Sequence, residues 1–68
     1  MKFHIIKVYR TNAKVDYDVT LESFSAMFAY VETWFGLTDF TMTQTPNYAK
    51  WVFRGADFSI FVFYSEVK

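Results

Sequence analysis

The first twenty residues show two patterns of apolar and polar positions. Residues 2–10 carry β-branched and aromatic side chains at both odd and even positions, which is typical of a strand covered on both faces. Thr11 and Asn12 supply turn chemistry, because Asn tolerates a left-handed backbone. Residues 13–19 then alternate strictly between apolar and polar side chains, so they predict a strand with one solvated face.

A helix is predicted over residues 21–35. Thr20 is a credible N-cap, Glu22 would place its charge at the positive end of the helix dipole, and Gly36 suits the position just past the C-terminus. Five apolar residues form a narrow stripe and three more flank it: Leu21, Phe24, Phe28, Val31 and Phe35 in the stripe, and Met27, Tyr30 and Trp34 beside it. This helix is expected to lie on a sheet.

After the helix the chain returns to a period of two. Residues 40–43 alternate and are rich in Thr, which favours a strand near the edge of the sheet. Residues 45–48 form a predicted turn with proline at its second position, where the fixed φ of proline is already correct. Residues 49–54 predict a fourth strand, in which Trp51 faces the side opposite to Lys50.

The last strand and its connection complete the fold. Gly55 and Ala56 have the length of a two-residue hairpin loop, with the glycine at positive φ, and residues 58–64 are apolar at nearly every position. The chain therefore predicts a single α+β domain over residues 1–68, with the element order β-β-α-β-β-β and one helix packed on a mostly antiparallel sheet of up to five strands. Numbered along the chain, the strand order 2-1-5-4-3 keeps hairpin partners adjacent and puts the two most apolar strands at the centre.

One helix covers only one face of such a sheet, which leaves an apolar surplus. Phe61 and Phe63 alternate with Ile60 and Val62, so whichever set meets the helix, the other faces elsewhere. A contiguous exposed apolar patch usually marks an interface. The helix-free face, with Phe61 and Phe63, is therefore expected to dock onto a second copy or another protein. The alternative is a sheet curled like a small barrel, which would bury both sets.

Composition supports a small intracellular protein. The 68 residues include nine Phe, five Tyr and two Trp, no Cys, one His and equal numbers of acidic and basic side chains. A chain this short buries only about 60% of its unfolded surface, so some of the aromatic content compensates for small size. The lack of Cys fits a reducing compartment, and no apolar run reaches the roughly 20 residues of a membrane helix. We expect a soluble, cytoplasmic protein.

Catalytic chemistry has little support in this sequence. His4 is the only imidazole, and no thiol is present as a nucleophile or metal ligand. Asp16 and Asp18 share a strand face and could in principle hold a cation, but alternating charge on a solvated strand gives the same pattern. The two glycines lie where turns need them, not in a phosphate-binding loop. We expect no enzyme activity, no cofactor and no metal.

The sequence thus favours a protein that works by contact, as an adaptor or inhibitor of the kind that phages and other mobile elements often encode, and that is homodimeric if its partner is a second copy. The predicted partner-binding residues are rigid aromatics: Tyr30, Trp34, Trp51, Phe61, Phe63 and Tyr64. The alternative function is binding of single-stranded nucleic acid, with exposed aromatics stacking on bases and basic residues tracking the backbone: Lys7, Arg10, Lys50 and Arg54. A net charge of zero weighs against it.

Overall fold

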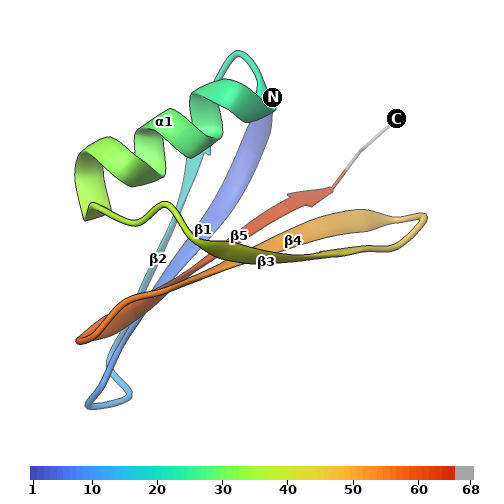
Figure 1. Cartoon of the computed structure of the whole chain (residues 1–68). Coiled ribbons are helices and arrows are strands. Elements are labelled where there is room, and N and C mark those ends of the chain that lie inside the picture. Colours follow the sequence, from blue (N-terminus) through green and yellow to red (C-terminus); the bar gives the residue numbers. More distant parts are fainter. Residues whose placement is uncertain (66–68) are drawn as a thin grey trace.

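A computed structural model describes residues 1–65 and contains one helix and five strands (Figure 1). Their bounds are β1 Lys2–Tyr9, β2 Lys14–Thr20, α1 Phe24–Phe35, β3 Phe40–Gln44, β4 Tyr48–Arg54 and β5 Phe58–Ser65. All neighbouring strands are antiparallel, in the order β2-β1-β5-β4-β3. The predicted α+β class, element order and strand order are confirmed.

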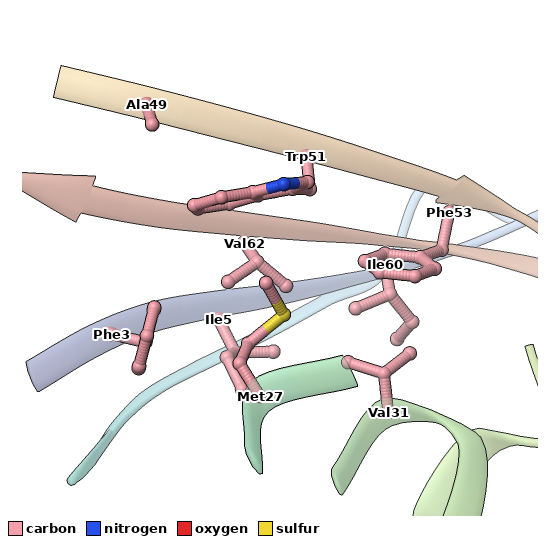
Figure 2. Close-up of a cluster of buried hydrophobic side chains, with 9 residues drawn as sticks. All are labelled: Phe3, Ile5, Met27, Val31, Ala49, Trp51, Phe53, Ile60 and Val62. Atoms are coloured by element: carbon pink, nitrogen blue, oxygen red, sulfur yellow. The ribbon is translucent and has the colours of Figure 1, made fainter. Parts of the chain in front are cut away.

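The helix lies across one face of the sheet, and the β3–β4 hairpin extends beyond it (Figure 1). Between helix and sheet lies a core of nine buried apolar residues: Phe3, Ile5, Met27, Val31, Ala49, Trp51, Phe53, Ile60 and Val62. Figure 2 shows Met27 and Val31 pointing from α1 toward the side chains of the central strands. Because side chains alternate along a strand, the residues between these core positions lie on the opposite face.

The sheet is open, not a barrel. Strands β2 and β3 stand at its two edges and do not pair with each other. Within residues 1–65, no element covers the face opposite α1. The barrel alternative is therefore wrong, and the apolar residues on the second face are not enclosed by the sheet itself. None of the helices in the described part of the chain has the length and hydropathy that crossing a membrane requires.

The helix begins three residues later than predicted. Thr20 is the last residue of β2, and the Leu21 N–H donates to the Met1 carbonyl at 2.8 Å, so strand pairing continues past Thr20. Ser23 is the N-cap instead, and its Oγ accepts a hydrogen bond from the Ala26 N–H at 3.1 Å. Glu22 consequently lies before the helix. The predicted C-terminal end is confirmed, since Gly36 adopts φ +70° and donates to the Glu32 carbonyl.

The buried stripe of the helix is also rotated from the predicted one. Met27 and Val31 are fully buried, whereas Phe24 is exposed and Phe28 is only half-buried. Met27, predicted on the flank, therefore lies at the centre of the contact. Phe24 and Phe28 reach sideways, and both rings pack against the ring of Trp51.

Two turns behave as predicted and one does not. Asn12 adopts φ +70°, and Thr45 closes its turn by donating its N–H to the Tyr48 carbonyl at 2.9 Å. Gly55 has no positive φ, and Arg54 pairs with Ser59, so the predicted two-residue loop is wrong. Glycine is needed at position 55 for a different reason. A Cβ there would lie 2.9 Å from the Phe58 carbonyl oxygen, which is closer than real Cβ atoms approach.

Candidate protein interface

The helix-free face has an apolar centre. Phe61 of β5 lies between Ile6 of β1 and Val52 of β4 in the strand register, and Phe63 lies two residues further along the same strand, on the same face. We define the apolar stripe as Ile6, Val8, Val52, Phe61 and Phe63. Each of these side chains is half-buried, because its neighbours on the sheet shield it laterally while its outer surface stays uncovered. The stripe therefore offers a contiguous apolar surface on the two central strands and β4.

Charged residues flank the stripe on both sides, and the two sides differ in charge. The β2 side carries both signs, because Asp16 lies beside Ile6, Asp18 beside His4 and Lys14 beside Val8. On the other side, Lys50 of β4 stands beside Phe63. Arg54 lies on the same strand and face, four residues further along. An apolar centre with a polar rim is the usual anatomy of a protein interface.

Asp18 is held in place by two neighbours. Its Oδ1 lies 2.8 Å from His4 Nδ1, and its Oδ2 lies 3.7 Å from Lys2 Nζ. The hydrogen bond with His4 lowers the pKa of Asp18, and the charge of Lys2 acts in the same direction. All three side chains are solvent-exposed, so these contacts add little stability and mainly fix the carboxylate at the rim of the stripe.

Two of the predicted partner-binding residues lie on the helix side instead. Trp51 is only 3% exposed and forms part of the core, and Tyr64 packs against Phe3 and Phe24. Both line an open groove of about 570 Å³ between α1 and the β3–β4 hairpin, a volume within the usual range of ligand pockets. Met42 lines the same groove. Trp51 and Tyr64 thus belong to a different surface from Phe61 and Phe63.

Tyr30 and Trp34 occupy a third place, on the flank of α1 above β2. The Tyr30 hydroxyl lies 3.1 Å from the Tyr17 hydroxyl, and its ring packs against Trp34, which is 69% exposed. The six predicted residues are therefore brought together only in pairs. All six were predicted to bind one partner because all six are aromatic, which the sequence shows directly. The face of the sheet or helix that each residue occupies depends on strand register and helix rotation, which the sequence does not show directly.

The pair formed by Tyr17 and Tyr30 leads to a prediction about alkaline pH. Burial raises the pKa of Tyr17, and the hydrogen bond with Tyr30 raises it further. A raised pKa means that the folded state favours the neutral phenol, so this stability is fully present below the unfolded pKa of about 10 and is lost as pH rises above it. Tyr17→Phe is expected to flatten the fall in unfolding free energy above about pH 10.

Urea unfolding of wild type and Tyr17→Phe at neutral and alkaline pH measures this effect. The loss at neutral pH should be about 1 kcal/mol or less, the usual net value of one hydrogen bond. Tyr9→Phe, at an exposed position with no such partner hydroxyl among the described residues, serves as the control. Equal alkaline slopes for wild type and Tyr17→Phe would contradict the prediction.

The basic residues invoked for nucleic-acid binding are also spread over different places. Lys7 is on the helix side, where its Nζ lies 4.5 Å from the ring centre of Phe58 and 5.5 Å from that of Phe35. Arg10 follows β1 at a turn. Only Lys50 and Arg54 share a face with Phe61.

The edge position of β3 was predicted from the sequence, but the exposure of its apolar side chains was not. Phe40 and Met42 face the helix side of the sheet, and both are 45% exposed. The alternation of these residues with Thr41 and Thr43 was visible in the sequence and did suggest an edge strand. What the pattern did not indicate is the degree of exposure. An edge strand has a neighbouring strand on one side only, so even its core-facing side chains stay partly exposed.

Neither a metal site nor a similarity to known proteins identifies the function of this chain. Within residues 1–65, no group of three or more His, Asp or Glu side chains is placed to hold a metal ion. No protein-family model, no curated protein and no solved structure matches this chain.

Proposed function

We propose that the chain is a cytoplasmic protein-binding module that acts by contact, as an adaptor or an inhibitor, through the apolar stripe of the helix-free face. The observation that carries the proposal is the one-sided packing of the sheet. The helix covers one face, and Ile6, Val52 and Phe61 stay open on the other within the described chain. Partial exposure of adjacent aromatic and β-branched residues on a rigid sheet favours binding, because little entropy is lost when such side chains are fixed.

The flanking charges specify the chemistry of the partner. Asp16 on the β2 side favours a basic group opposite it, whereas Lys50 and Arg54 on the β4 side favour acidic groups. The partner surface should therefore have an apolar centre, an acidic flank opposite Lys50 and Arg54, and a basic group opposite Asp16, while Lys14 beside Val8 makes the β2 side mixed in charge. The same arrangement weighs against a nucleic acid, because the phosphate backbone would meet Asp16 and Asp18 on one side of the stripe.

We expect Phe61→Lys and Phe61→Thr to weaken partner binding strongly without unfolding the chain. The Thr variant removes the aromatic ring but keeps a high β propensity at the position. The Lys variant also removes the ring and in addition places a charge at the apolar contact. An aromatic hot spot contributes at least about 2 kcal/mol, so the affinity should fall about thirtyfold or more. Val15→Lys is the control, since Val15 is 49% exposed on the helix side of β2.

The experiment starts with proteins retained from a lysate of the source cells and continues with each retained protein in purified form. The proposal requires direct binding, measured by calorimetry, that is about thirtyfold or more weaker in both Phe61 variants and unchanged in Val15→Lys. It also requires weaker binding by Asp16→Lys. A partner whose affinity is unchanged by the Phe61 variants would overturn the proposal. So would retention of single-stranded nucleic acid alone, with an affinity that falls steeply with salt.

A further inference from the structure

The backbone of β3 has unpaired groups on its outer side. The hydrogen bond from the Thr45 N–H to the Tyr48 carbonyl fixes which residues face β4, because hydrogen-bonded and non-hydrogen-bonded pairs alternate along an antiparallel ladder. Thr41 and Thr43 direct their N–H and C=O groups toward β4. The same groups of Phe40, Met42 and Gln44 therefore point away from the sheet. Since β3 is an edge strand, no strand of the described chain pairs with them.

None of the usual protections against edge pairing is present on β3. Its sequence, Phe-Thr-Met-Thr-Gln, contains no charge and no proline, and all five residues are exposed. Natural edge strands are normally protected by charged side chains, proline or a bulge. An uncharged, exposed edge strand is ready to accept another strand.

The opposite edge, β2, is protected by charge. The hydrogen bonds from Tyr9 N–H to Ala13 and from Leu21 N–H to Met1 show that Lys14, Asp16, Asp18 and Thr20 direct their backbone groups outward. Two copies of β2 paired with all these groups in use would place Asp16 directly opposite Asp18, and a pairing centred on either carboxylate would place it opposite itself. Like charges directly opposite each other destabilise a strand pair.

We propose that a second copy of the chain pairs antiparallel with β3, with the two-fold axis passing through Met42. In this register Met42 pairs with Met42 of the second copy, Phe40 pairs with Gln44, and Thr41 stands opposite Thr43. The outward N–H and C=O groups of all three outward-facing residues then find partners. The register brings no charges together, and it creates Thr–Thr pairs, which are favourable cross-strand contacts.

The self-complementarity of this register is the reason for assigning a second copy as the occupant. The pattern of outward groups on β3 is unchanged by a half-turn about Met42, so the strand fits its own copy with every group in use. The two sheets join into one, with a charged β2 strand at each outer edge. Met42 also lines the groove beside α1, so the Met42 pair adds apolar contact on the helix side. The pairing uses a different surface from the apolar stripe and does not depend on the proposed function.

Cross-linking tests the proposed two-fold axis directly. The chain has no Cys, so a Met42→Cys variant carries a single thiol that meets its own copy. Cα atoms in a hydrogen-bonded antiparallel pair are about 5.5 Å apart, within disulfide range. Under mild oxidation this variant is expected to form a covalent dimer at least tenfold faster than Val15→Cys, whose thiol has similar exposure on the charged edge. Equal rates would overturn the proposal.

Charge pairing at the same position provides the second test. Met42→Lys and Met42→Asp are each expected to be monomeric at concentrations where wild type associates, because each places like charges on the axis. An equimolar mixture of the two is expected to form a heterodimer, measured by sedimentation. Circular dichroism checks that both variants are folded. Self-association of wild type that both single variants retain, or a mixture that stays monomeric, would contradict the proposed pairing.

Discussion

Replacing Phe53 with Ala is expected to remove about 3–5 kcal/mol of stability, the usual cost of truncating a fully buried Phe. Phe53 is 1% exposed, and its ring packs against the rings of Phe28 and Phe40. The loss combines removed apolar contact with a cavity that a small core cannot refill. A domain of this size has a stability near the low end of the usual 5–15 kcal/mol, so the variant should be largely unfolded at 37 °C. Urea unfolding followed by tryptophan fluorescence measures the effect, since Trp51 is buried in the same core.

Phe61→Ala is the matched control for this prediction. The two residues have the same side chain and lie on neighbouring strands, but Phe61 is half-buried on the helix-free face. Its truncation leaves a surface hollow that water fills, so the expected loss is about 1 kcal/mol. Similar losses for the two variants would show that both faces of the sheet act as core, and the one-sided architecture would then be wrong.

Met27→Lys is expected to unfold the chain. Met27 is fully buried between α1 and the sheet, as Figure 2 shows. A lysine there has no acidic residue to pair with in the core, where no polar side chain of the described residues is buried. Burying an unpaired charge costs at least about 3–5 kcal/mol, comparable with the whole stability of the domain. Loss of the far-ultraviolet circular dichroism signal at neutral pH is the expected result.

Ala29→Lys provides the comparison, because Ala29 is exposed two residues further along the same helix. Lysine has a helix propensity close to that of alanine, so the stability should change by less than about 0.5 kcal/mol. The pair of variants measures the rotation of the helix about its axis. A folded Met27→Lys variant would show that Met27 lies on the flank, as the sequence pattern had indicated.

The order of the strands could be predicted because the chain distributes its apolar residues unevenly. Strands β1 and β5 carry them on both parities, whereas β2 alternates and β3 is rich in Thr. Covered strands belong in the centre and half-polar strands at the edges. Short turns at Asn12 and Pro46 then left few ways to connect the strands, so local patterns were sufficient to determine the topology.

The rotation of the helix could not be obtained in the same way. Its apolar arc is wide enough that several rotations bury a similar amount of surface. The helix starts later than the sequence pattern predicted, with Ser23 as its N-cap, because Leu21 is still hydrogen-bonded to Met1 as part of the strand pairing. That hydrogen bond joins two segments that are distant in the sequence, so no local sequence pattern predicts it. Phe24 then became an exposed wall of the groove instead of a core residue.

The candidate interface was half predictable for a related reason. Phe61 and Phe63 were assigned to the helix-free face from the alternation within β5, and the register places them there. Trp51 and Tyr64 have the same residue chemistry but lie on the other parity of their strands. Composition shows which side chains are aromatic and suited to binding, whereas the pairing of β4 with β5 decides which of them face away from the helix and remain available to a partner.

The central pairing of β1 with β5 also determines how this chain must fold. Phe3 pairs with Tyr64 and Tyr9 pairs with Phe58, so the middle of the sheet joins segments from nearly opposite ends of the described sequence. Closing so long a loop costs conformational entropy before the contacts between β1 and β5 can offset it. We therefore expect this chain to fold more slowly than helical proteins of similar length. During synthesis, β1, β2 and α1 leave the ribosome first and remain without half of their core until β5 follows. For that interval the nascent chain exposes Phe3, Ile5 and Met27, and transiently exposed apolar surface of this kind makes a partly folded chain prone to aggregation.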